Sequence, residues 1–402
     1  MSDFMNKVLL VFIVFVISAA TFEGFFVKWG FHDSDVLREF ASFEKMYEGT
    51  ARKPFVYRQL LISVSKGVVK VLPHETKEVI VQKIKNDNFL ARKFKEVDIK
   101  DKFLIEYYIV YFLAFMCLFT SIFVWRKICI DLTGNPIAGT LAPLTFTIIF
   151  PYFETYGGYF YDFSELLFFS LATYFALKGR YLVLILMTPL AAHNKESFFF
   201  FLLTLYPLLH RTQTTKNTLM VLGVSSFLAL LTYCPTFLRF AGNEGFMAEY
   251  NFIKDVPVIV MFVYFIAVYI LCKKTYTKSP LLSYAFFVIF VVMMFILRGS
   301  EHPLIIFNTL GHTYSVISGE KAFLLHLVLI FWIVKSAWKF LDSSLKNYAK
   351  LALAINTPLI MLFGWVFELR NWSIMYPIFI ILIAFYYKEK IKEVGFLSEV
   401  QS

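Results

Sequence analysis

Long apolar runs separated by short polar breaks make up most of this 402-residue chain. A helix needs roughly 20 mainly apolar residues to cross the hydrocarbon core of a bilayer. The runs are continuous rather than alternating, which argues against a β-barrel. The pattern therefore predicts an all-α, polytopic transmembrane protein with about twelve membrane segments. The segments are expected near residues 5–27, 103–125, 137–153, 162–178, 181–193, 196–210, 217–239, 256–272, 280–298, 319–338, 350–367 and 372–387.

The longest polar stretch of the chain lies between the first two apolar runs, at residues 28–102. No composition shift elsewhere marks a second folding unit. We interpret residues 1–402 as a single integral membrane domain. In that domain, 28–102 forms the first outer loop and 103–390 forms a helical membrane bundle.

This first outer loop carries helical patterns of its own. Val36, Phe40, Phe43 and Tyr47 recur at the spacing of one helix face, which predicts an amphipathic helix. A second helix is expected over 55–72 and is apolar enough to lie in the membrane interface. A third, over 75–96, is rich in lysine and is expected to lie against anionic headgroups.

Lysine and arginine indicate how the chain is oriented, because they gather in every second short loop. The basic loops lie at residues 126–127, 178–180, 211–216, 273–278, 335–350 and 388–392. Short loops rich in lysine and arginine stay in the cytoplasm. Both termini are then cytoplasmic, and the orientation favours a bacterial inner membrane with the outer side facing the periplasm.

Composition adds little to this picture. Charged residues make up 17% of the chain and hydrophobic residues 58%, against about 25% charged residues in soluble domains. The net charge of +10 comes mostly from loop lysines, so the expected partner is the lipid bilayer and not nucleic acid. The four cysteines are scattered without metal-ligand spacing, and the residues by themselves predict no metal site.

Asp33 and Asp35 lie a few residues beyond the first apolar run, in front of the expected amphipathic helix. One of them could be a carboxylate that binds a catalytic metal or deprotonates an acceptor. Alternatively, one or both cap the following helix. Both interpretations fit the position of the two residues.

Tyr57 and Arg58 lie one turn into the second expected helix of the outer loop. An arginine there has its guanidinium near lipid phosphates, and a bidentate phosphate contact suits arginine better than lysine. The alternative is that Arg58 extends to ordinary headgroups and binds no specific ligand.

Asp162 and Glu165 lie three residues apart at the start of an apolar run, after a stretch rich in tyrosine and phenylalanine that also contains Glu154. Ionisable groups at such places are costly and are usually functional or paired. The aromatic rings could form an interfacial belt or a platform for sugar. Asp162 could also be a helix cap.

Asn194, Lys195 and Glu196 interrupt the apolar residues between 181 and 210. The two flanking runs are shorter than a full crossing, so this region is either one re-entrant hairpin or two spans joined by a tight turn. Lys195 is a candidate for binding an anionic group such as pyrophosphate. The alternative is a local ion pair between Lys195 and Glu196.

Two later breaks each bring an arginine close to a glutamate at a span end: Arg298 with Glu301 and His302, and Glu368 with Arg370. Arg298, His302, Glu368 and Arg370 are therefore candidate substrate-binding residues. Mutual pairing within each break is the alternative.

In its organisation the chain resembles the GT-C superfamily of glycosyltransferases, which use polyprenyl-linked sugars. The resemblance lies in the many spans, the large first outer loop with interfacial helices, and the position of Asp33 and Asp35. It covers the first half of the chain. It implies a catalytic or metal-binding carboxylate at Asp33 or Asp35 and a second one at Asp162, Glu165 or Glu154. It also allows a divalent metal, Mg²⁺ or Mn²⁺.

The resemblance also implies a substrate: a polyprenyl-phosphate-linked sugar, transferred on the outer side of the membrane to a glycan or lipid acceptor in cell-surface polysaccharide or glycoconjugate assembly. The phosphate is a good leaving group, so the enzyme mainly binds charge and activates the acceptor hydroxyl. Positive charge would come from Arg58, Lys195, Arg298 and Arg370.

Other functions compete with this one. A polysaccharide polymerase or ligase would use similar lipid-linked repeat units, although it would be expected to have its largest outer loop in the second half of the chain. A transporter or flippase for lipid-linked oligosaccharide would be expected to show charges deep in its spans and broken helices in matched halves. An assembly role without catalysis is the remaining alternative.

Overall fold

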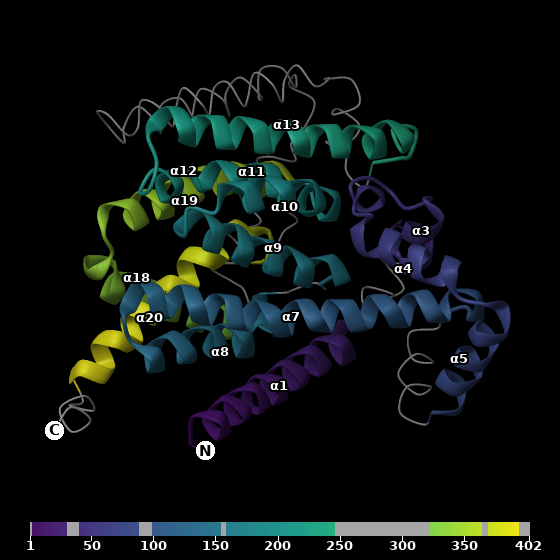
Figure 1. The fold of residues 1–402 in the computed structure, drawn as a ribbon, viewed down its shortest axis with the longest axis horizontal. Coiled ribbons are helices and arrows are strands. Elements are labelled where there is room, and N and C mark those ends of the chain that lie inside the picture. The colour runs from purple at the N-terminus through teal and green to yellow at the C-terminus, as the bar shows by residue number, and fades with distance from the viewer. Residues whose placement is uncertain are drawn as a thin grey trace.

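The computed structural model describes residues 2–29, 40–87, 99–153, 158–245, 321–363 and 369–393. Within these ranges all the regular elements are helices, and the only strand-like feature is an isolated bridge between Lys53 and Gly245. The all-α prediction is therefore confirmed (Figure 1). The segments predicted at 256–272 and 280–298 lie outside the described residues.

Within the described ranges, three helices are long and apolar enough to cross a membrane: α1 (Ser2–Trp29), α7 (Leu104–Thr133) and α13 (Thr215–Arg239). Two shorter apolar helices, α8 (Pro136–Phe153) and α10 (Tyr181–Asn194), accompany them. The chain is a helical membrane protein, and the twelve-segment count remains a prediction. The other helices of the bundle are α9 (Phe160–Leu177), α11 (Ser197–Thr204), α12 (Tyr206–Leu209), α18 (Lys321–Ala337), α19 (Ser343–Phe363) and α20 (Tyr376–Glu393), with 3₁₀ turns η4 (Trp338–Phe340) and η5 (Leu369–Met375).

The boundaries between these helices follow local chemistry. Gly134, in the left-handed conformation with φ of 68°, ends α7, a conformation that glycine adopts at little cost. The Asn135 side chain then accepts from the backbone N–H groups of Ile137 and Ala138 and starts α8. The run predicted over 196–210 divides at Leu205 into α11 and α12.

The described part of residues 28–102, the predicted first outer loop, contains α3 (Phe43–Glu48), η2 (Phe55–Tyr57), α4 (Leu60–Val71) and α5 (His74–Asn86), and η3 (Asp101–Phe103) leads into α7. Two predictions for this loop need correction. The helix expected through Phe40 and Tyr47 is interrupted at Ser42, whose side chain caps α3 by accepting from the backbone N–H of Lys45.

The helix expected over 55–72 is also interrupted, at Arg58 and Gln59. The cause is tertiary: the Gln59 backbone N–H donates to the carbonyl of His193 on α10 at 3.2 Å. The Gln59 side chain donates to the carbonyls of Met46 and Val56 at 3.2 and 2.8 Å. Contacts with other segments therefore override the local helical pattern, and they place Arg58 at the break.

The two ends of the bundle differ. α3, α4 and α5 lie at one end, whereas α1 and α20 carry the N- and C-termini toward the other (Figure 1). At this terminal end the basic loops meet: Lys127 and Lys178 both contact Asp131, each at 2.9 Å, and Arg211 contacts Asp342 at 2.8 Å. The arrangement agrees with the alternation of basic loops along the sequence.

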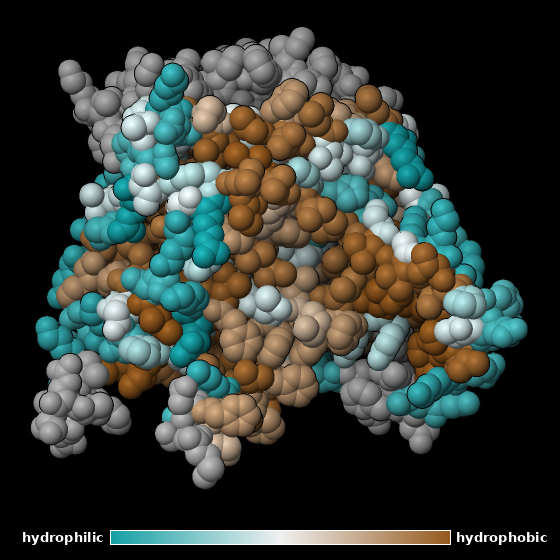
Figure 2. Space-filling model, in the orientation of Figure 1, coloured by the Kyte–Doolittle hydropathy of each residue, from teal (hydrophilic) through white to brown (hydrophobic). Residues whose placement is uncertain are grey.

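Between these ends the surface is apolar. Figure 2 shows hydrophobic side chains over the middle of the bundle and hydrophilic ones toward its two ends. Phe12, Phe227 and Leu238 are more than half exposed. Soluble proteins rarely expose large apolar areas, so this belt is the expected lipid-facing surface. Inside the bundle, α7 packs against α8 and α9, and α10 packs against α13.

Candidate functional site

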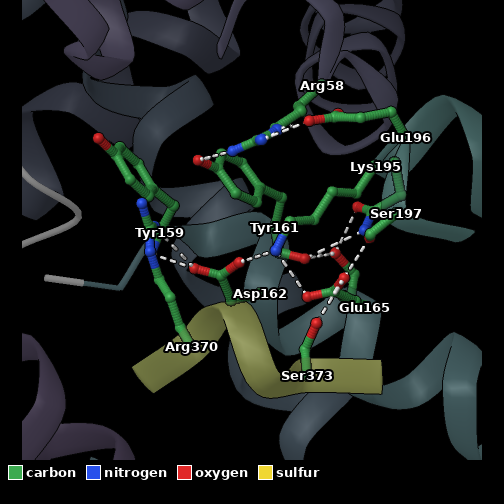
Figure 3. Close-up of polar contacts among 12 residues, drawn as sticks. Arg58, Tyr159, Tyr161, Asp162, Glu165, Lys195, Glu196, Ser197, Arg370 and Ser373 are labelled. Carbon is green, nitrogen blue, oxygen red and sulfur yellow. Dashed lines mark hydrogen bonds and ion pairs between the residues drawn. The ribbon is translucent and has the colours of Figure 1, made fainter. Parts of the chain in front are cut away.

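Polar side chains from four separate segments meet inside the bundle, at the end nearer to α3 and α4 (Figure 3). They come from the break before α4, the start of α9, the break between α10 and α11, and η5. We call this group the outer-end cluster. Its ionisable members are Arg58, Asp162, Glu165, Lys195, Glu196 and Arg370.

Asp162 lies in the first turn of α9, where the backbone leaves N–H groups without helical partners. Its carboxylate accepts from the backbone N–H of Tyr159 at 2.8 Å, so the predicted capping role is present. It also contacts the Lys195 ammonium at 2.8 Å and the Arg370 guanidinium at 3.4 Å. Asp162 therefore stabilises the start of the helix and pairs with two cations at once.

Glu165 lies one turn further along the same face of α9. It accepts from Lys195 at 2.7 Å, from the hydroxyl of Ser373 at 3.2 Å and from the hydroxyl of Ser197. Two of its donors are neutral, whereas Asp162 is held by a backbone group and two cations. Glu165 is therefore less tightly bound to positive charge than Asp162.

Lys195 lies between these two carboxylates, at the point where α10 ends. It is 9% exposed, and Asp162 and Glu165 are each 4% exposed. The local pair between Lys195 and Glu196 considered from the sequence is wrong, because Glu196 contacts Arg58 instead. Burying charges costs several kcal/mol per ion unless they are well paired, so the cluster persists only as a set.

Arg58 contacts Glu196 through two nitrogens, Nε at 3.2 Å and Nη2 at 2.5 Å. Its third nitrogen, Nη1, donates to the Tyr161 hydroxyl. The guanidinium also lies over the Tyr161 ring, with its carbon 4.5 Å from the ring centroid. Arg58 therefore points into the bundle and does not extend to headgroups.

Tyr161 and Tyr159 are stacked, with centroids 4.9 Å apart and planes 11° from parallel. Arg370 lies over the Tyr159 ring at 4.6 Å, as Arg58 lies over Tyr161. Contact with an aromatic face stabilises a guanidinium most when water is excluded. The tyrosine pair thus serves as a support for two of the three buried cations.

Asn194 and Tyr57 have other roles. The Asn194 side chain donates to the Tyr161 carbonyl at 3.0 Å and accepts from Ser164 at 2.5 Å, which ties α10 to α9. Tyr57 is buried against Tyr233 and Phe237 of α13. Asn194 borders the cluster and positions it, and Tyr57 packs outside it.

The structure thus brings together residues predicted separately from four parts of the sequence. Six further candidates lie outside the described residues: Asp33, Asp35, Glu154, Arg298, His302 and Glu368. Sequence reasoning missed Tyr159, Tyr161, Ser197 and Ser373 as individual site residues. Tyrosine and serine are common near span ends, and nothing in their spacing distinguishes these four.

The carboxylates of the cluster do not fit a divalent metal as they stand. Asp162 and Glu165 face an ammonium that lies between them. Elsewhere in the described ranges, no three His, Cys, Asp or Glu side chains gather in a metal-binding arrangement.

A scan against protein-family models and searches of curated proteins and of solved structures find no match to this chain. The resemblance to GT-C glycosyltransferases stays a prediction from sequence organisation.

Proposed function

We propose that this protein is a membrane glycosyltransferase that uses a polyprenyl-phosphate-linked sugar, with the outer-end cluster as its active site. The observation that carries the proposal is the meeting of three basic and three acidic side chains in one place, five of them buried and Glu196 partly exposed, next to an apolar surface that is expected to face lipid. Such clusters are expensive to maintain and usually mark a functional site. The membrane is then a bacterial inner membrane, with the cluster on the periplasmic side and both termini in the cytoplasm.

The side chains present suit this reaction. A sugar linked to phosphate has its own leaving group, so the protein must bind the phosphate charge and accept a proton from the acceptor hydroxyl. Arg58, Lys195 and Arg370 provide positive charge at the cluster. These cations are held among carboxylates in the described structure, which keeps the buried site close to neutral.

Glu165 is the proposed base. Its neutral hydroxyl partners, Ser197 and Ser373, keep it oriented when Lys195 turns toward a phosphate. Asp162, by contrast, is fixed by the backbone of Tyr159 and by Arg370. Its role is to hold the start of α9 and the two cations in position.

A transporter of lipid-linked oligosaccharide is the second candidate. It is favoured by the break between α10 and α11, which places Lys195 inside the bundle at the meeting point of two helix ends. Broken helices with buried polar groups are typical of transporter binding sites. The same purified protein can distinguish the two functions.

The test is sugar transfer by the protein in liposomes, with labelled polyprenyl-phosphate sugars and a mixture of glycan and lipid acceptors. We expect wild type to transfer sugar, Glu165→Gln to lose at least a hundredfold in rate, and Asp162→Asn to lose less. Asp131→Asn is the matched control, because Asp131 also holds two cations but at the terminal end. Movement of intact donor between leaflets without transfer would support the transporter, and neither activity with any donor would reject both functions.

A further inference from the structure

The Arg58–Glu196 pair is the most accessible part of the outer-end cluster. The Glu196 side chain is 26% exposed, whereas the side chains of Asp162, Glu165, Lys195 and Arg370 range from 3% to 10%. A ligand that enters from the surface therefore meets Glu196 before it meets the buried charges.

Glu196 contacts Arg58 in the geometry that a phosphate would use. Both of its oxygens bind one edge of the guanidinium, through Nε and Nη2. Arginine binds phosphate through the same pair of parallel hydrogen bonds. The opposite side of the guanidinium is fixed by the hydroxyl and ring of Tyr161. Arg58 is therefore preorganised, and a phosphate can replace the carboxylate without moving it.

Apolar side chains form an exposed surface on each of the two helices that flank this pair. On α4, Val64 and Val68 are each 40% exposed, and on α10, Leu186 and Leu190 are 64% and 53% exposed. The two helices are joined beside the cluster, where the Ser63 hydroxyl lies 3.4 Å from Nε2 of His193. A hydrocarbon chain fits this surface, whereas a free phosphate gains nothing from it.

We propose that Glu196 occupies the position of the donor phosphate on Arg58, and that a lipid-linked phosphate displaces it on binding. The lipid chain then lies along the exposed faces of α4 and α10. This inference rests on the proposed function and deepens it, because it assigns the phosphate subsite and the lipid path. Glu196 also neutralises the charge of Arg58 whenever no donor is bound.

Binding measurements on the full chain in phosphatidylcholine nanodiscs test the displacement. The probes are a long-chain polyprenyl monophosphate and inorganic pyrophosphate. We expect Glu196→Gln to bind the polyprenyl phosphate roughly tenfold more tightly than wild type, because a competing charged partner of Arg58 is removed. Arg58→Lys should bind at least tenfold more weakly, and the control Asp131→Asn should match wild type.

A second measurement uses wild type alone, so it does not depend on how a variant folds. Carbodiimide labels accessible carboxylates, and mass spectrometry locates the label. We expect labelling of Glu196 to rise several-fold when polyprenyl phosphate saturates the protein, since the carboxylate leaves Arg58. Labelling of Asp131 should not change.

The outcomes separate this inference from the proposed function. If wild type binds polyprenyl phosphate but Glu196→Gln binds it no more tightly and Glu196 labelling does not rise, the displacement is wrong and the glycosyltransferase proposal stands. An equal gain of Glu196→Gln for pyrophosphate would overturn the lipid path. Absence of polyprenyl-phosphate binding to wild type and to Glu196→Gln would overturn both proposals.

Discussion

The two ends of the bundle hold the same kinds of ion pair in opposite surroundings. At the terminal end, Asp131 pairs with Lys127 and Lys178, and these side chains are 23% to 55% exposed. At the outer end, Lys195 pairs with Asp162 and Glu165, and these side chains are 3% to 10% exposed. Each end thus has one ion held between two ions of opposite charge.

The difference in burial changes what each triad contributes. Exposed pairs are screened by water and salt and contribute about 0–1 kcal/mol. Buried ions lose several kcal/mol of hydration each, which their mutual attraction offsets only when the geometry is good. The terminal triad lies among the basic loops of the chain, whereas the outer triad is an expensive arrangement that packing alone does not require.

The largest expected effect comes from removing the central ion of the buried triad. Lys195→Met leaves Asp162 and Glu165 facing each other without their shared cation, and should cost about 3–5 kcal/mol of unfolding free energy. Unfolding of the purified protein in detergent by increasing dodecyl sulfate measures this. A loss below about 1 kcal/mol would show that the outer triad is solvated like the terminal one.

Removing a carboxylate together with the lysine should recover part of that loss. In Lys195→Met with Glu165→Gln, only the Asp162 charge remains, and it keeps its contacts with Arg370 and Tyr159. We expect the double variant to be about 1–3 kcal/mol more stable than Lys195→Met alone, a coupling typical of residues in one network. Additive losses in the same unfolding assay would contradict a shared network.

The sequence predicts the helices and the ionisable residues of the outer-end cluster, but not which of those residues form ion pairs with each other. Apolar runs and the basic loops between them are local signals, so α1, α9 and the break at Asn194 were predicted close to where they lie. Lys195 and Glu196 were considered as partners of each other because spacing along a chain reports only local neighbours. Their actual partners come from α9 and from the break before α4, and helix packing alone decides those contacts.

The helix predicted over 55–72 is broken for the same reason: a contact with a distant segment, which the sequence pattern does not report, ends it. The residues of 55–72 have helical propensity and an apolar face, and nothing local indicates a stop at Arg58. The stop depends on the carbonyl of His193, which accepts from Gln59. Sequence reasoning therefore found the ionisable residues of the cluster but not the hydrogen bonds that orient them.

Tyr47 and Glu106 form a pair of intermediate burial. The Tyr47 hydroxyl donates to Glu106 at 3.0 Å, and burial followed by the nearby carboxylate raises the pKa of Tyr47 to about 12. Tyr47→Phe should cost about 1 kcal/mol at neutral pH, as for one hydrogen bond. Unfolding in detergent measures this, with Tyr181→Phe as control, because the hydrogen bond between the Tyr181 and Thr212 hydroxyls is exposed to solvent.

The raised pKa of Tyr47 determines how the free energy of unfolding changes with pH. The folded state keeps its proton on Tyr47 more firmly than the unfolded state does, whose pKa is near 10. The stability associated with this proton is therefore complete below about pH 10 and is lost as the pH rises toward 12. Wild type should lose stability in that interval more steeply than Tyr47→Phe, and parallel curves would contradict the shift.

The smallest loss of unfolding free energy is expected for a substitution in the terminal triad of Asp131, Lys127 and Lys178. Lys178→Met removes one of the two cations that contact Asp131, and Lys178 is 39% exposed. The loss should be at most about 0.5–1 kcal/mol and should fall further as salt is raised from 0.01 to 1 M, because the screening length shortens from about 30 to 3 Å. The loss caused by Lys195→Met should stay constant over the same range, since salt does not enter a buried triad. An equal salt dependence of the two variants would mean that water and ions reach both ends of the bundle alike, and burial would no longer distinguish the outer-end cluster.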